Sequence, residues 1–145
     1  MERREMLKTV AAATLAAMSG SAIAGEHDHH NHKAPKKYAA LITSSGDCVQ
    51  TGEACLAHCL VLLGQGEKEM AACAQSVNEL LAVCTALQKL AGQDSKNTAK
   101  FAKLAADVCA DCEKECRKHE KKHAECKACA DSCAACVKEC KALAA

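Results

Sequence analysis

The chain has 145 residues, 19 Lys and Arg against 18 Asp and Glu, and 13 cysteines, with no tryptophan. This composition favours a single domain and excludes a sheet-rich fold, because β-branched and aromatic residues are too few. A nearly neutral chain also lacks the one-sided basic face that binding to nucleic acid requires, so that class of partner is excluded.

Residues 1–24 have the features of an export signal rather than of a folded segment. Arg3 and Arg4 precede a mildly apolar run, Val10–Met18, and Ala22-Ile23-Ala24 offers a small-x-small cleavage site. The run is too short and too rich in alanine to span a membrane. The arginine pair resembles a twin-arginine leader, and an ordinary Sec signal is the alternative. We therefore expect export from the cytoplasm to the periplasm or to a membrane-associated compartment, which leaves a mature chain of zero net charge.

Residues 25–35 form a polar, histidine-rich stretch that we expect to be a disordered tail. The rest of the chain, residues 36–145, is predicted to be one folded domain. Its single proline, Pro35, stands just before it, where a helix can begin.

Small and apolar residues in this domain recur at steps of three and four, which predicts α-helices. The expected helices cover about 36–63, 70–91, 96–123 and 126–143. Gly64-Gln65-Gly66 ends the first, and Asp94 or Ser95 is a candidate N-cap for the third. Phe101, Leu104 and Val108 are expected to pack early in the third helix. Four helices joined by short links predict an all-α fold, an antiparallel up-and-down four-helix bundle.

Cysteine occupies the inward-facing positions of these helices. In the stretch CKACADSCAACVKEC, residues 126–140, the five cysteines step by three, four, three and four. Such spacing places them on one helical stripe, so the bundle is predicted to have a cysteine-lined core. The thirteen are Cys48, Cys55, Cys59, Cys73, Cys84, Cys109, Cys112, Cys116, Cys126, Cys129, Cys133, Cys136 and Cys140.

Disulfides and tetrahedral metal sites fit this pattern poorly. Helical neighbours three or four residues apart have Cβ atoms about 5–6 Å apart, whereas a disulfide requires about 3.8 Å. Cross-helix pairs stay open, although thirteen thiols would leave one over. Zinc tetrathiolate sites would each bury two surplus negative charges, which is costly. Iron–sulfur clusters need loops and the Cys-Pro ending of ferredoxin motifs, which is absent.

Copper(I) suits the core best. It is a soft ion that prefers thiolates and accepts two or three of them. Two opposed metal–sulfur bonds, taken at the zinc–thiolate length, span about 4.6 Å, which cysteines one turn apart can reach. Each Cu(I) replaces one thiol proton, so a core loaded with one copper per cysteine stays neutral. The alternative of cysteine as a small buried hydrophobe explains one or two such residues, not thirteen.

The chain resembles the bacterial copper storage proteins, a family of cysteine-rich four-helix bundles. The resemblance covers about residues 36–143 and rests on CLAHC at 55–59, CADCEKEC at 109–116 and the stretch at 126–140. It implies a homo-oligomeric bundle, often a tetramer, that stores Cu(I) and, in an exported member, supplies copper to a cuproenzyme such as methane monooxygenase. The chain departs from a fully cysteine-lined seam at Leu41, Ser45 and Gly52, so we expect that end of the core to hold less copper.

Four further side chains are candidate ligands at one end of the bundle. The first and third helices run parallel, so His58 and His119 with His123 should share an end with Met70, which begins the second helix. We predict His58 and Met70 as copper ligands, and leave open whether His119 and His123 bind metal or are merely solvated. Cleavage after Ala24 would also expose Gly25-Glu26-His27, whose four nitrogens suit square-planar Cu(II), and a linker with incidental metal affinity is the alternative.

The predicted function is therefore metal storage, without catalysis. A thiol redox sensor would need an exposed cysteine of low pKa and a resolving partner, and a copper chaperone normally carries one exposed Cys-x-x-Cys. A redox sensor or a zinc-binding protein is the alternative function that stays open.

Overall fold

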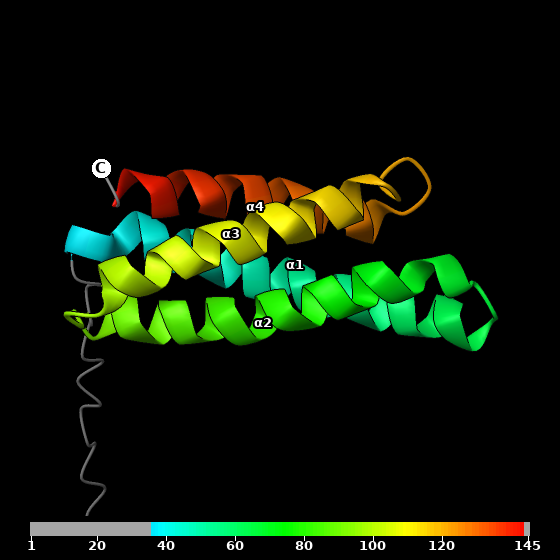
Figure 1. Ribbon diagram of the computed structural model, residues 1–145, viewed down its shortest axis with the longest axis horizontal. Coiled ribbons are helices and arrows are strands. Elements are labelled where there is room, and N and C mark those ends of the chain that lie inside the picture. The colour runs from blue at the N-terminus through cyan, green and yellow to red at the C-terminus, as the bar shows by residue number, and fades with distance from the viewer. Residues whose placement is uncertain (1–35, 144–145) are drawn as a thin grey trace, which may run out of the picture. The chain divides into compact units, whose positions relative to one another are not determined.

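The computed structural model describes residues 36–143, which form four α-helices arranged as an antiparallel bundle (Figure 1). The helices are α1 (Ala39–Gly64), α2 (Ala71–Gly92), α3 (Thr98–Arg117) and α4 (Ala124–Ala142). Two 3-10 turns, η2 (Lys36–Tyr38) and η3 (Lys68–Met70), precede α1 and α2. These residues contain no strand, and the predicted all-α bundle is confirmed. The predicted signal and the histidine-rich tail lie outside the described residues.

Each helix packs against the helices that precede and follow it around the bundle, and α1 closes the ring against α4. The C-terminal turns of α1 and α3 therefore meet the N-terminal turns of α2 and α4 at one end, which we call the histidine end (Figure 1). The opposite end, formed by the starts of α1 and α3 and the last turns of α2 and α4, is called the apolar end. Its buried side chains include Tyr38, Leu41, Leu87, Ala91 and Ala102.

Short links set the helix ends. Gly66 has a φ of 95°, a left-handed conformation that glycine adopts readily. There the Glu67 N–H donates to the Leu62 carbonyl, which closes the last turn of α1. Between α2 and α3, Asp94 has a φ of 50°, and the Ser95 N–H donates to the Leu90 carbonyl at 3.0 Å.

The predicted N-cap of the third helix was wrong. Its N-cap is Asn97 rather than Asp94 or Ser95, because those two residues complete the turn that leaves α2. The Ser95 hydroxyl instead accepts a hydrogen bond from the Asn97 N–H at 3.3 Å. The predicted packing of Leu104 was also wrong, since its side chain is 49% exposed, while Val108 is buried.

One helical stretch among the described residues, Lys68–Gly92, has the length and apolar composition that could cross a membrane. Core helices of soluble proteins have the same property, and this one carries Cys73 and Cys84 on its buried face. The stretch is weak evidence for a membrane span.

Candidate metal centre

All thirteen cysteine side chains are fully buried, and every one is a free thiol. The helical spacing of the sequence explains their common direction, because each lies on the stripe that its helix turns toward the bundle axis. The predicted cysteine-lined core is confirmed.

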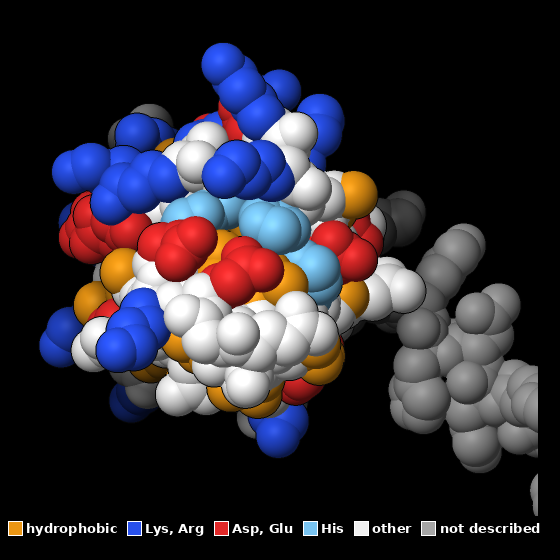
Figure 2. Space-filling model, turned by 90° about the vertical axis from the view of Figure 1, so that its right-hand side faces the viewer, with side chains coloured by type: hydrophobic (Ala, Val, Ile, Leu, Met, Phe, Trp, Pro, Cys, Tyr) orange, Lys and Arg blue, Asp and Glu red, His pale blue; other side chains and the backbone are white. Residues whose placement is uncertain are grey.

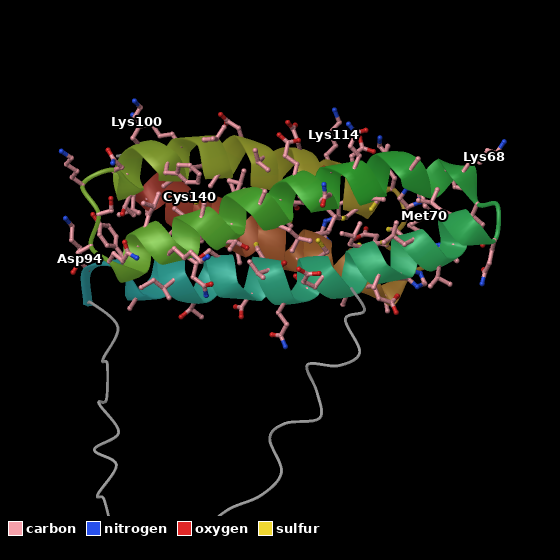
Figure 3. All side chains as sticks on the ribbon, turned by 90° about the horizontal axis from the view of Figure 1, so that it is seen from below. Lys68, Met70, Asp94, Lys100, Lys114 and Cys140 are labelled. Carbon is pink, nitrogen blue, oxygen red and sulfur yellow. The ribbon has the colours of Figure 1, made fainter. Side chains whose placement is uncertain are left out.

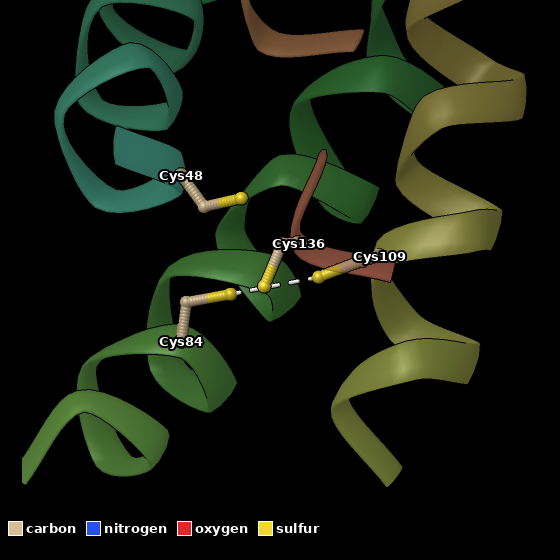
Figure 4. Close-up of side chains that lie close together, drawn as sticks. All are labelled: Cys48, Cys84, Cys109 and Cys136. Atoms are coloured by element: carbon tan, nitrogen blue, oxygen red, sulfur yellow. Dashed lines mark hydrogen bonds between the residues drawn. The ribbon is translucent and has the colours of Figure 1, made fainter. Parts of the chain in front are cut away.

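The first group of sulfurs takes one cysteine from each helix. Cys48 of α1, Cys84 of α2, Cys109 of α3 and Cys136 of α4 point toward one another across the core (Figure 4). Their Sγ atoms all lie within 4.8 Å of one another, and the Cys84 and Cys109 sulfurs are 3.6 Å apart. Four residues distant in sequence thus form one layer of possible ligands.

Three more groups continue this layer toward the histidine end. They are Cys112 with Cys129 and Cys133, Cys55 with Cys116 and Cys129, and Cys55 with Cys59, Cys73 and Cys126. Short separations between sulfur atoms join them: 3.9 Å from Cys112 to Cys116, 3.6 Å from Cys73 to Cys116 and 3.8 Å from Cys55 to Cys126. Cys140 joins the first layer through Cys136, at 3.9 Å. The sulfurs therefore form a column along the core.

The electrostatics of the column favour neutral thiols at many positions. Burial raises the pKa of the Cys59 thiol, and the neighbouring Cys55 and Cys73 raise it further. The pKa of Cys109 is also raised, but by a hydrogen bond with Cys136. The neutral Cys109 thiol is the donor in this bond, so the bond stabilises the protonated form. Where a neighbour donates instead, the thiolate is favoured. Hydrogen bonds from Cys109 and Cys133 outweigh the effect of burial and lower the pKa of Cys48 to about 5.

Thiolates in the column leave negative charge in the core that has to be balanced. Among the described residues no Lys or Arg is buried, and the only buried polar side chains are Ser44, Ser45 and Thr98. Several thiolates together would have no protein cation to balance them. A bound cation that replaces the thiol protons removes this cost, so the column is better suited to holding monovalent metal ions than to remaining ionised.

Packing explains why two inward-facing positions of α1, Ser45 and Gly52, do not carry cysteine. A Cβ atom at Gly52 would lie 3.0 Å from Leu81 Cδ2, so a cysteine at this position would require the Leu81 side chain to shift. Ser45 is buried and donates to the Leu41 carbonyl at 2.7 Å. The sulfur column therefore reaches the apolar end only through Cys140, in the last turn of α4. Figure 3 shows Met70 at the opposite end from Asp94 and Lys100.

The histidine end brings together residues from three of the predicted segments. His58 Nε2 lies 2.9 Å from His123 Nδ1, and the rings of His119 and His123 are 6.5 Å apart between centroids. Met70 is fully buried at the start of α2. The sequence did not single out Glu125, whose Oε2 lies 3.7 Å from His58 Nε2. Its position two residues after His123, in the first turn of α4, is the signal that could have identified it.

A four-helix bundle whose core is a column of buried free thiols is a metal-binding protein of the cysteine-rich bundle class. The sequence profile of the copper storage proteins, Csp, matches residues 34–145. The chain belongs to the copper storage protein family.

Solved structures of related proteins have the same fold. The apo form of copper storage protein 3 from Bacillus subtilis is 30% identical, with a TM-score of 0.66 over 74% of this chain and 99% of its own. The Cu(I)-bound copper storage protein BsCsp3 is 29% identical, with a TM-score of 0.67 over 74% of this chain and 98% of its own. The copper storage protein Ccsp from Streptomyces lividans, loaded with 10 copper equivalents, is 25% identical, with a TM-score of 0.67 over 79% of this chain and 89% of its own. A comparison with curated protein sequences gives no match.

Proposed function

We propose that this chain stores Cu(I) by binding many ions along its cysteine column and that it has no catalytic activity. The observation that carries the proposal is the column itself: thirteen fully buried, free thiols, with neighbouring sulfurs 3.6–4.0 Å apart. Three metal–sulfur bonds at the thiolate length used above place the sulfurs of a trigonal site about 4.0 Å apart. The column already has that spacing, and two-coordinate sites need a small widening.

The proposed ligands are the thirteen cysteines together with Met70 and His58. Met70 is buried beside the start of α2 and offers a soft thioether to a soft ion. His58 lies at the histidine end, one residue from Cys59. We place copper entry at this end, because the histidines lie here beside Cys59, whereas only Cys140 reaches the apolar end.

Zinc is the competing occupant. Four thiolates around a tetrahedral zinc ion lie about 3.8 Å apart, a spacing close to the 3.6 Å between Cys84 and Cys109 in the first layer. A zinc tetrathiolate carries two negative charges, however, and the described core holds no cation to offset them. A redox sensor is disfavoured because every thiol is buried and none is placed to meet a partner protein.

Three further features belong to the same proposal. Residues 1–24 act as an export signal, residues 25–35 are a tail, and residues 36–145 are the copper-binding bundle. The exported protein is a homo-oligomer, with the tetramer as the form that the family resemblance suggests. It releases copper to an exported or membrane cuproenzyme, such as methane monooxygenase.

Anaerobic titration of the reduced protein with Cu(I), against a competing chelator, tests the storage function. We expect about one Cu(I) bound and about one proton released per cysteine. Cys109→Ala removes one ligand of the first layer and should lower the capacity, whereas Ser44→Ala, a buried change outside the thiol column, should not. A plateau at three or four metal ions with a preference for Zn(II) would refute storage and favour a zinc protein.

A further inference from the structure

The link between α3 and α4, residues 118–123, lies at the histidine end and buries none of its own side chains, all of which are exposed or partly exposed. Figure 2 shows this end of the bundle, with acidic and basic side chains around the histidines. The α1–α2 link at the same end is anchored by apolar packing, because Met70 and Leu62 beside it are buried. Segments with few buried apolar contacts open at the lowest cost. The α3–α4 link is therefore the part of this end that opens most readily.

Arg117, the last residue of α3, fastens this link through three ion pairs. Its Nη1 lies 2.8 Å from Glu120 Oε2 in the link and 2.7 Å from Asp131 Oδ1 in α4. Its Nη2 lies 3.2 Å from Glu113 Oε1 on α3 itself, which holds the guanidinium in place. One side chain thus connects the link with both of the helices that it joins.

The charges on both sides of this contact favour it. Hydrogen bonds to Glu120 and Asp131 raise the pKa of Arg117. Hydrogen bonds from Lys127 and then from Arg117 lower the pKa of Asp131. The Arg117 side chain is 34% exposed and that of Asp131 is 48% exposed. Because the pair is partly open to solvent, dissolved salt should weaken it.

The link separates two buried thiols of the column. Cys116 lies in the last turn of α3 and Cys126 in the first turn of α4. Both are fully buried. Each belongs to a group of sulfurs that also contains Cys55. An ion or a reagent can reach either sulfur only when the structure that covers it moves.

We propose that Arg117 is a latch, which holds the α3–α4 link closed over Cys116 and Cys126 and so sets the rate at which ions pass between solvent and the column. Arg117 itself is not a metal ligand, because a guanidinium offers donors and no lone pair. The latch therefore controls the rate of exchange and leaves the capacity unchanged. This inference deepens the proposed function and rests on it, since the rate concerns stored copper.

The first test needs no copper. The full reduced chain is treated with iodoacetamide, a small neutral reagent, and the alkylated cysteines are identified by peptide mass spectrometry over time. We expect Cys116 and Cys126 to react about tenfold faster in Arg117→Gln than in wild type, because three partly exposed ion pairs are lost. Cys84 and Cys109, in the first layer, should react at the wild-type rate.

Two comparisons make this test specific to the latch. The control Lys118→Gln removes a neighbouring ion pair, the one with Glu115 at 2.6 Å, and should behave as wild type. Added sodium chloride should speed alkylation of wild type and leave Arg117→Gln unchanged, because only wild type has the ion pairs to be screened. A salt effect of equal size in both proteins would contradict the latch.

A second variant covers the case in which Arg117→Gln does not fold. Glu120→Gln removes only the contact with the link, keeps the one with Asp131, and should give a smaller acceleration at Cys116 and Cys126. Wild-type rates at these two thiols in the folded variants would overturn the proposal. Equal acceleration of all thiols would also overturn it, because that result indicates a general loosening of the bundle.

Copper measurements on the same proteins separate the latch from storage. After anaerobic loading, wild type and Arg117→Gln should hold equal numbers of Cu(I) ions, and a chelator should remove them about tenfold faster from the variant. If wild type binds no Cu(I) but alkylation differs as expected, storage is refuted and the latch stands as a control on access to the thiols. If Cu(I) loads fully and its removal rate is the same in both proteins, the latch is refuted and storage stands.

Discussion

Raising the pH should destabilise the reduced, copper-free bundle, because the folded chain keeps protons on thiols that the unfolded chain loses. Cys55 and Cys126 form one contact of the column, with sulfurs 3.8 Å apart. A hydrogen bond from Cys116 lowers the pKa of Cys55, but hydrogen bonds with Cys126 and Cys129, together with burial, outweigh it and raise the pKa to about 12. For Cys126 a hydrogen bond from Cys55 lowers the pKa, and the hydrogen bond with Cys73 and burial raise it to about 12.

The sign and size follow from these pKa values. A thiol whose folded pKa is raised contributes stability that is fully present below its unfolded pKa of 9.0 and is lost as the pH rises toward 12. In that window each such thiol lowers the free energy of unfolding by about 1.4 kcal/mol per pH unit. The pair lowers it by about 2.7 kcal/mol per pH unit. Two pH units would remove about 5 kcal/mol, which is comparable with the whole stability of a small domain.

Denaturant unfolding of the reduced apo protein, followed by circular dichroism at several pH values from about 9 to about 11, measures this slope. The matched variant is Cys55→Ala/Cys126→Ala. Its free energy of unfolding should fall with rising pH less steeply than that of wild type, by about 2.7 kcal/mol per pH unit. All other side chains are common to the two proteins, so their contributions cancel in the comparison. In copper-loaded wild type the thiols carry no protons, so their contribution to the pH dependence of the free energy of unfolding should be absent. Equal slopes in wild type and the double variant would refute the reasoning.

Three other outcomes are expected. Copper-loaded protein should melt well above apo protein, because a ligand that binds only the folded state stabilises it; equal melting temperatures would argue against sites in the core. Leu87→Ala, at a fully buried position of the apolar end, should cost about 2–5 kcal/mol in the free energy of unfolding. It should leave the Cu(I) count unchanged, and a lower count would place copper at that end. In the mature protein, His27→Ala should abolish a square-planar Cu(II) absorption band; a terminus other than Gly25 by mass spectrometry, or an unchanged band, would remove the tail site.

The helices and the direction of the thiols could be predicted from the sequence, because both depend on local periodicity. Spacing of three and four residues places Cys126, Cys129, Cys133, Cys136 and Cys140 on one face of any helix that forms. A core made of such faces in four successive helices is lined with sulfur whatever the details of packing. The proximity of His58 to His123 was also expected, since antiparallel topology places the ends of the first and third helices together.

Only the tertiary structure decided which thiols meet. The layer of Cys48, Cys84, Cys109 and Cys136 depends on how far each helix slides along its neighbours, and that register is set by links and packing across the whole bundle. The same holds for Glu125, whose carboxylate approaches His58 only because α4 begins at Ala124 beside α1. The exposed Leu104 and the N-cap at Asn97 have a similar origin, because the turn after α2 uses Asp94 and Ser95 and sets the rotation of α3. Periodicity records which side of a helix faces inward, but contacts between helices depend on their relative shift and rotation, which no local pattern contains.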